Sequence, residues 1–224
     1  MNDFGIGITT YNRPKLLEFT LSQFDKFGGD IVVIDDHSKG GCSSRCIRNE
    51  KRLGVAKSKN KCISLLKDYK KIFLFDDDCF PIKDKWWEIY EGEHHYAHAA
   101  RPPQYVKKYE GKNAYWNGAL GCCMMIDQTV LKRVGGMNAK FGFYGFEHVE
   151  YTMRIYRNGL IPYPWITPKN VQDYIWSFDA LGSYDGFDWQ PGSSISQKEK
   201  DKLIAQNEIL FRNGNDPLGF RPFD

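Results

Sequence analysis

The chain of 224 residues lacks any long hydrophobic run, and no stretch approaches the roughly 18 apolar residues that would cross a bilayer. Its first residues, Met1-Asn2-Asp3, lead directly into a predicted strand, without the basic and apolar regions of a signal peptide. These absences argue against an integral membrane protein and a secreted one. We therefore expect a soluble, cytoplasmic protein without integral membrane association.

The sequence also has no pair of CxxC units, which argues against a structural zinc site of the usual spacing. The simplest interpretation of the six cysteines is that they are buried or incidental thiols. Cys42 and Cys46, which flank a Ser-rich turn, leave a metal or redox pair open as an alternative. His94, His95 and His98 are close in sequence, but they alternate between the faces of a predicted strand, which disfavours a metal cluster.

Charge is present in both signs but is unevenly distributed. From Lys39 to Lys71 there are eleven Lys and Arg against two acids, a net charge of +9, whereas the whole chain carries +3. A basic segment of this kind suits a polyanionic ligand such as a diphosphate, and nucleic acid is a conceivable alternative. The plainer interpretation is a Lys-rich helix with a solvated face.

Strands and helices alternate along the first third of the chain. We expect strands at 4–8, 31–34 and 72–76 and helices at 13–27 and 55–69. This order is typical of right-handed βαβ units around a parallel sheet, so the predicted class is α/β. Further along, the pattern predicts a strand at 120–126, a helix at 147–158 and a C-terminal helix introduced by a capping box of Ser196 and Glu199.

Three consecutive aspartates, Asp76, Asp77 and Asp78, follow the apolar run Ile72 to Phe75. They are expected at the carboxyl end of a buried strand, where open α/β sheets bind ligands. Three adjacent like charges repel one another. A hard divalent cation with oxygen ligands is the natural compensation, and a solvated acidic turn is the alternative.

Several segments occur together in an order and approximate spacing typical of one protein family. Over about residues 4–160 the chain resembles the family 2 glycosyltransferases, catalytic domains of the GT-A fold. The segments that carry the resemblance are Ile8-Thr9-Thr10-Tyr11-Asn12-Arg13-Pro14, Val33-Ile34-Asp35-Asp36-His37-Ser38, Gly54-Val55-Ala56 with Lys59-Asn60, Phe75-Asp76-Asp77-Asp78, and Gly145-Phe146-Glu147-His148 with Arg154.

The resemblance implies a Rossmann-like mixed sheet flanked by helices and a site for a nucleotide-sugar. The residues implied in that site are Thr9, Thr10, Tyr11, Arg13, Asp35, Asp36, Lys59, Asp76 and Asp77. Hydroxyl and backbone groups of the first turn would bind base and ribose, and Asp35 or Asp36 would bind the base edge or the ribose. Lys59 stands where the family usually has Arg, and would neutralise phosphate as a point charge, with Lys57 as the local alternative.

The segment Asp76-x-Asp78 matches the DxD pattern of the GT-A enzymes. By resemblance, Asp78 would bind Mn²⁺ or Mg²⁺ with Asp76 as the second metal-binding carboxylate, and the cation would stabilise the leaving diphosphate. Family members often add a later histidine ligand, but no histidine follows His148. The third ligand therefore stays open, with water as one candidate.

The family usually has Glu-Asp where this chain has Glu147-His148, and that Asp is the general base for the acceptor hydroxyl. An imidazole and a carboxylate are both groups that enzymes use as bases. We therefore expect Glu147 or His148 to be the catalytic base, and leave the choice open.

These observations predict a metal-dependent glycosyltransferase that moves a sugar from a nucleoside-diphosphate sugar to an acceptor hydroxyl with inversion. The resemblance to the family favours UDP as the nucleotide. One domain, 1–224, is expected, with a nucleotide-sugar half at about 1–100, an acceptor half at about 101–165 and a C-terminal extension at 166–224. A glycan acceptor is expected, with a protein or nucleic acid as alternatives. A sugar-nucleotide pyrophosphorylase is the rival enzyme, but its Gly-rich loop is absent after the first strand; a non-catalytic binding module is the third interpretation.

Overall fold

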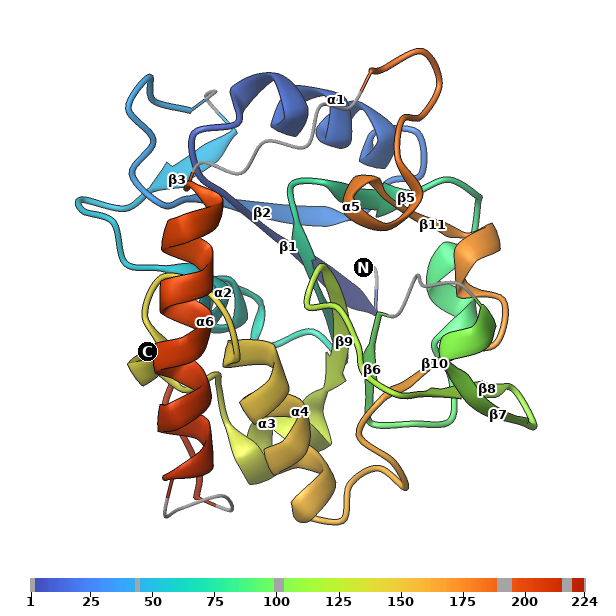
Figure 1. Cartoon of the computed structure of the whole chain (residues 1–224). Helices are drawn as coiled ribbons and strands as arrows, with labels where there is room; N and C mark the ends of the chain where they lie inside the picture. The colour runs from blue at the N-terminus through green and yellow to red at the C-terminus, as the bar shows by residue number, and fades with distance from the viewer. Residues whose placement is uncertain (1–2, 43–44, 99–102, 189–194, 215–218, 224) are drawn as a thin grey trace.

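The computed structural model describes residues 3–42, 45–98, 103–188, 195–214 and 219–223. A six-stranded sheet with the order β3-β2-β1-β4-β9-β6 forms its centre (Figure 1). These strands are β1 (Phe4–Thr10), β2 (Asp30–Asp35), β3 (Cys46–Arg48), β4 (Lys71–Asp76), β6 (His95–Ala97) and β9 (Cys123–Asp127). The first four are parallel, and β9 is antiparallel to its neighbours β4 and β6. The predicted α/β class with a mixed sheet is confirmed.

Helices α1 (Pro14–Phe24) and α2 (Val55–Leu66) pack on opposite faces of this sheet. Phe24 of α1 meets Phe75 of β4 edge to face, with ring centroids 5.0 Å apart. On the other face, a Cβ added to Gly7 would lie 2.5 Å from the Cβ of Cys62 in α2. Only glycine therefore lets α2 approach β1 this closely. Both helices were predicted, but each predicted C-terminal end lies three residues beyond the observed one.

The remaining described elements are the strands of two smaller sheets and a set of helices. Strand β5 (Cys79–Pro81) pairs with β11 (Ile175–Ser177), and β8 (Asn113–Trp116) lies between β7 (Val106–Glu110) and β10 (Ile166–Pro168). The later helices are α3 (Gln128–Val134), α4 (Glu147–Arg157), α5 (Phe178–Leu181) and α6 (Gln197–Arg212). Short 3-10 helices are η1 (Trp86–Ile89), η2 (Pro103–Tyr105), η3 (Ala139–Phe141) and η4 (Val171–Asp173).

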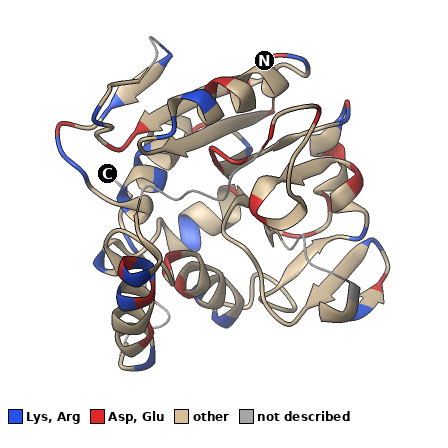
Figure 2. Cartoon of the chain, turned by 45° about the horizontal axis from the view of Figure 1, so that its top comes forward, with Lys and Arg blue, Asp and Glu red and all other residues tan. Residues whose placement is uncertain are grey.

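The C-terminal helix α6 begins as the sequence predicts. Ser196 is its N-cap, and its hydroxyl accepts a hydrogen bond from the amide of Glu199 at 3.3 Å. Lys and Arg are interspersed with Asp and Glu along this helix (Figure 2). In the part of the chain that the structure describes, α6 and the other helices are all too short or too polar to cross a membrane.

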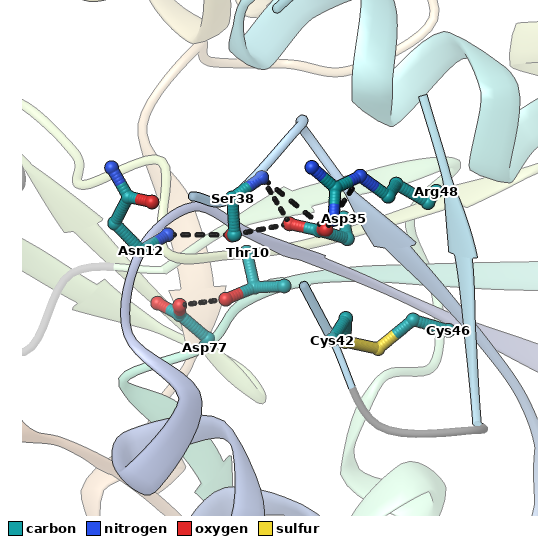
Figure 3. Close-up of a disulfide and its surroundings, with 8 residues drawn as sticks. All are labelled: Thr10, Asn12, Asp35, Ser38, Cys42, Cys46, Arg48 and Asp77. Carbon is teal, nitrogen blue, oxygen red and sulfur yellow. Dashed lines mark hydrogen bonds and ion pairs between the residues drawn. A yellow bond between two sulfur atoms is a disulfide. The ribbon is translucent and has the colours of Figure 1, made fainter. Parts of the chain in front are cut away.

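The cysteines depart from the simplest expectation at one place. Cys42 and Cys46 form a disulfide, with their Cα atoms 6.0 Å apart, beside the turn that follows β2 (Figure 3). This corrects the interpretation of the pair as incidental thiols, since the turn brings both Cα atoms within the normal span of a disulfide. The other four cysteines, at 62, 79, 122 and 123, are buried thiols.

The first two members of the histidine run have separate structural roles. His94 binds the carboxylate of Asp127 through Nδ1 at 2.6 Å. His95 is fully buried, and its two ring nitrogens lie 2.8 Å from the carbonyl oxygen of Met125 and 2.9 Å from the hydroxyl of Thr152. These two rings therefore do not share a metal, as the strand alternation indicated.

The buried imidazole of His95 predicts a loss of stability in acid. Burial lowers its pKa from 6.5 to about 4, partly offset by the Met125 carbonyl and Asp127. As the pH falls, the unfolded chain therefore takes up the proton before the folded chain does. The contribution of the neutral His95 ring to stability is present above pH 6.5 and is lost as the pH falls toward 4. A difference of this size is worth about 3 kcal/mol at most.

Urea denaturation between pH 7 and pH 4 measures this effect. His95→Gln is expected to flatten the decline in the free energy of unfolding, although His98 contributes in the same direction because burial also lowers its pKa to about 4. His94→Gln, next to His95 in the chain but half exposed and outside the strand, is the control and should keep the wild-type slope. An unaltered slope in His95→Gln would contradict the assignment.

Candidate functional site

A cavity of about 670 Å³ opens where β1, β2 and β4 end. This is the edge at which parallel sheets place their ligands, and the volume is in the range of small-molecule sites. The cavity brings together most of the predicted site residues, from segments far apart in the chain. Those in its wall are Thr9, Thr10, Tyr11, Arg13, Asp36, Asp76, Asp78, Glu147 and His148.

The three consecutive aspartates divide between the cavity and the core. Asp77 is fully buried behind the wall, where it pairs with the guanidinium of Arg13 and accepts a hydrogen bond from the hydroxyl of Thr10 at 2.6 Å. The hydroxyl of Thr20 in α1 donates to its carbonyl oxygen at 2.6 Å. Asp77 therefore anchors the turn to α1 and does not border the cavity itself.

Asp78 faces the cavity and is only partly neutralised. One of its oxygens lies 3.1 Å from Nη1 of Arg13, while the other, Oδ1, is buried and has no hydrogen-bond partner among the described residues. Burial raises the pKa of Asp78 to about 7 against the opposing charge of Arg13, and the negative charges of Asp76, Asp77 and Asp179 raise it further. An unsatisfied oxygen among several carboxylates fits a divalent cation.

Lys59 is another predicted donor-site residue that lies behind the wall of the cavity. Its side chain is 1% exposed, and its ammonium binds Asp76 at 2.9 Å and the carbonyl oxygen of Gly121 at 2.6 Å. Burial lowers the pKa of Lys59, but the charge and hydrogen bond of Asp76 outweigh it, so the pKa is raised. Lys59 therefore holds Asp76 from behind the wall, because the geometry of α2 turns its side chain inward.

The two aspartates after β2 also have different surroundings. Asp35 is fully buried and accepts hydrogen bonds from the amide and hydroxyl of Ser38, with Arg48 4.0 Å away (Figure 3). Asp36 lines the cavity and accepts from the amides of Leu53 and Gly54, at 2.7 and 2.9 Å. Of the two candidates, Asp36 alone borders the cavity, while Asp35 stabilises the turn that carries it.

Glu147 and His148, the first two residues of helix α4, also border the cavity. The ring Nδ1 of His148 lies 3.3 Å from Oε1 of Glu147, and Oε2 of Glu147 is buried without a hydrogen-bond partner in the described structure. Burial would raise the pKa of Glu147, but the hydrogen bond and charge of His148 and the charge of Lys59 lower it. Gly121 leaves room for the ring, since a Cβ there would be 2.8 Å from His148 Cγ.

Arg52 and Asp179 are charged residues of the cavity wall that were not predicted as site residues from the sequence. Arg52 lies between the rings of Tyr11 and Phe143, with its guanidinium carbon 4.2 and 4.5 Å from their centroids. Asp179, in α5, borders the cavity beside Asp78. Arg52 could have been chosen from the basic segment 39–71 only with knowledge of which side chains face inward. Asp179 has no motif around it that marks it.

The C-terminal helix completes the wall. Gln197, Lys200 and Ile204 of α6 line the cavity together with the loop that precedes Glu147. The side-chain amide of Asn207 fixes that loop from α6, donating to the carbonyl oxygens of residues 141, 144 and 145 at 2.6, 2.9 and 2.9 Å. The segment predicted as an extension therefore takes part in the site.

Known proteins share similarity with this chain in sequence and in fold. No protein-family model matches the chain. An uncharacterized glycosyltransferase of Acanthamoeba polyphaga mimivirus is 28% identical over 194 residues, which cover 70% of this chain and 75% of that protein.

Among solved structures, a mannosyltransferase from Pyrobaculum calidifontis in complex with GDP-Man and Mn²⁺ superposes with a TM-score of 0.60 at 17% identity, covering 75% of this chain. GalNAc-T7 with UDP, GalNAc and Mn²⁺ gives a TM-score of 0.62 at 14% identity, covering 93%. The matched regions span 55% and 47% of those two chains. The chain has the GT-A fold, as the sequence indicated.

Proposed function

We propose that this GT-A chain is a metal-dependent glycosyltransferase that transfers a sugar from a nucleoside-diphosphate sugar to an acceptor hydroxyl. One observation carries the proposal. Asp76 and Asp78 border the same cavity as Glu147, and both Asp78 and Glu147 keep a buried carboxylate oxygen that no described residue satisfies. Buried polar groups are rarely left in this state unless they serve a ligand or a reaction.

The donor would occupy the side of the cavity formed by the ends of β1, β2 and β4. Tyr11 offers a ring face for the base, Asp36 and Thr9 offer oxygens for the ribose, and Arg52 offers a cation for phosphate. We propose a UDP-sugar as the donor, because the sequence resembles the family 2 glycosyltransferases. In this arrangement Arg52 takes the phosphate contact first assigned to Lys59, whose ammonium is already bound to Asp76.

Asp78 and Asp76 would hold Mn²⁺ or Mg²⁺, and Asp179 would be the third carboxylate in place of the absent histidine. When bound, the cation neutralises the charge that develops on the leaving diphosphate. Arg13 pairs with Asp78 and Lys59 pairs with Asp76, so each of these two basic side chains holds a carboxylate that borders the cavity. This arrangement limits the reorganisation that metal binding requires.

Glu147 is the base in this proposal, and His148 positions it. The hydrogen bond from His148 occupies Oε1 and leaves Oε2 to take the proton of the acceptor hydroxyl. The oxygen of the deprotonated acceptor hydroxyl then attacks the anomeric carbon as the bond from that carbon to the diphosphate breaks, with inversion of configuration. A lowered pKa keeps Glu147 ionised at neutral pH, ready to accept the proton.

The acceptor is proposed to enter between α6 and the loop before Glu147. Phe143, Tyr144 and Lys200 lie there, a mixture of aromatic and polar groups that suits a sugar acceptor. We therefore propose a glycan, with about 1–100 forming the donor half and the later segments forming the acceptor side. A protein or nucleic acid acceptor would be recognised by sugar transfer to the peptide or to the oligonucleotide in the assay below.

The test is a donor panel with purified protein. Hydrolysis of UDP-, GDP- and other nucleotide-sugars is measured with Mn²⁺, with Mg²⁺ and with chelator, followed by transfer to glycan, peptide and oligonucleotide acceptors. Metal-dependent release of one nucleoside diphosphate is expected. Binding of nucleotide-sugar without turnover on any acceptor would favour a binding module, and release of pyrophosphate from sugar phosphate and nucleotide would favour a pyrophosphorylase.

Replacement of Asp179 tests the third carboxylate. Asp179→Asn is expected to raise the Mn²⁺ concentration for half-maximal activity by about tenfold or more, because a group that holds the cation loses its charge. The rate at saturating Mn²⁺ should fall much less. Asp173→Asn, an exposed aspartate of the neighbouring η4 that does not border the cavity, is the matched control. Equal Mn²⁺ dependence in both variants would remove Asp179 from the site.

A further inference from the structure

Two buried thiols and a buried imidazole meet behind the aspartate turn. The Sγ atoms of Cys79 and Cys122 and a ring nitrogen of His98 all lie within 4.8 Å of one another. Cys79 is 0% exposed, Cys122 is 7% exposed and His98 is 2% exposed. They come from β5, from the residue before β9 and from the residue after β6, neighbouring segments of the fold (Figure 1).

His98 is the feature that asks for an explanation. Both of its ring nitrogens are buried and have no hydrogen-bond partner among the described residues, whereas nearby His95 satisfies both of its own. A buried polar group without a partner costs about 1–3 kcal/mol. Burial also lowers the pKa of His98 to about 4, so the ring is neutral and has a lone pair to offer.

We propose that Cys79, His98 and Cys122 bind a zinc ion, at a site separate from the carboxylates of the donor site. Thiolate sulfur and imidazole nitrogen are the ligands that Zn²⁺ prefers, and hard cations such as Mn²⁺ and Mg²⁺ favour oxygen. This inference does not depend on the proposed glycosyltransferase activity.

The size and charge of the cluster fit that ion. Zn–S bonds of about 2.3 Å in a tetrahedron place two sulfurs about 3.8 Å apart, so the ligand atoms need to close by at most about 1 Å. On binding, each thiol releases its proton to solvent. Two thiolates, one neutral imidazole and one divalent cation then carry no net charge, which is the condition under which an ion is tolerated in a buried place.

The three protein ligands would leave the fourth coordination position of the zinc ion to a water, near residues that also line the cavity. Ser177 lies directly opposite Cys79 in the β5–β11 ladder, and its buried hydroxyl has no hydrogen-bond partner in the described part of the chain. Directly opposed residues project from the same face of a sheet, so this hydroxyl can hold a water in the fourth position. The ion would join three segments that support Asp76 and Asp78, and we expect its role to be structural.

The sequence rule that disfavoured zinc missed this site because the rule counts ligands in closely spaced pairs. Here His98 lies 19 positions after Cys79, and Cys122 lies 24 positions after His98. Only the pairing of β9 with both β4 and β6 brings the three segments together.

The experiment uses the full chain, purified without a histidine tag or chelator. Elemental analysis should find a single equivalent of zinc that survives dialysis. After exchange with Co²⁺, a sulfur-to-cobalt charge-transfer band in the near ultraviolet is expected, which carboxylates of the donor site cannot produce. The band should be lost in Cys79→Ser and Cys122→Ser and kept in Cys62→Ser, a buried thiol on α2 outside the cluster.

Measurements on the unaltered chain cover the case in which the variants fail to fold. A strong zinc chelator should lower the melting temperature and make two further thiols reactive toward a thiol reagent, and added Zn²⁺ should reverse both changes. Absence of the charge-transfer band, together with a melting temperature that neither chelator nor Zn²⁺ shifts, would overturn the proposal. A disulfide between Cys79 and Cys122 found by mass spectrometry would overturn it as well.

Discussion

Glu147→Gln is expected to lower the rate of sugar transfer by about 10²–10⁴-fold, the range that a general base contributes. Glutamine keeps the shape of the side chain and its hydrogen bond to His148 but cannot accept the proton. Binding of the nucleoside diphosphate, measured by calorimetry with Mn²⁺, should be almost unaffected, because Glu147 lies on the acceptor side of the cavity. A fall in the turnover number without a fall in donor affinity is therefore the expected signature.

His148→Gln is the matched variant, and it should lose much less activity because His148 only positions the carboxylate. The pH profile separates the two residues further. Burial alone would raise the pKa of Glu147, but the hydrogen bond and charge of His148 and the charge of Lys59 lower it, so the rate should persist to a pH below the ordinary pKa of a glutamate. A rate that falls below pH 6–7 like an ordinary histidine, together with greater loss in His148→Gln, would make His148 the base.

Asp78→Asn is expected to abolish metal-dependent transfer, with a loss of at least about 10²-fold even at high Mn²⁺. The amide removes the charge from a carboxylate that borders the cavity and has one buried oxygen without a hydrogen-bond partner among the described residues. A preorganised charge that acts on the leaving group is worth several kcal/mol in comparable sites. Steady-state kinetics across a Mn²⁺ titration measure the effect, and Mn²⁺ binding can be followed independently by electron paramagnetic resonance.

Two further aspartates provide contrast. Asp84→Asn, an exposed residue outside the cavity, should retain wild-type activity and Mn²⁺ dependence. Asp77→Asn should mainly reduce thermal stability, because Asp77 is buried against Arg13 and Thr10 and does not border the cavity. If Asp77→Asn lost Mn²⁺ binding while Asp78→Asn kept it, the roles of the two residues would be exchanged.

The first half of the fold could be predicted from the sequence because its signals are local. Apolar runs, glycine stops and the alternation of strands with helices place β1, α1, β2, α2 and β4 without knowledge of distant contacts. The three-stranded sheet of β7, β8 and β10 was not predicted. Strand β10 pairs with β8 across a long stretch of sequence, as in Asn113 with Pro168, and even the local β7–β8 pair is made of short strands that carry little periodicity of their own.

The candidate site was predicted where a motif fixes a residue at a strand end, as at Thr9, Asp76 and Asp78. Motifs do not specify which way a neighbouring side chain turns. Lys59 and Asp35 have the expected residue type near the expected place, yet their side chains are buried in other contacts. Arg52 and Asp179 enter the cavity through loop and helix placement that depends on the whole fold.

The hydrogen bonds of Asn207 make the order of synthesis matter. Its amide fixes three carbonyl groups of the loop that leads into Glu147, although Asn207 is more than 60 residues further along the chain. A ribosome-bound chain that has released everything up to α5 would already hold Asp76 and Asp78, and it would still lack the clamp on the loop before Glu147. Donor binding would then precede catalytic competence, and reactivity would arise only as the final helix docks.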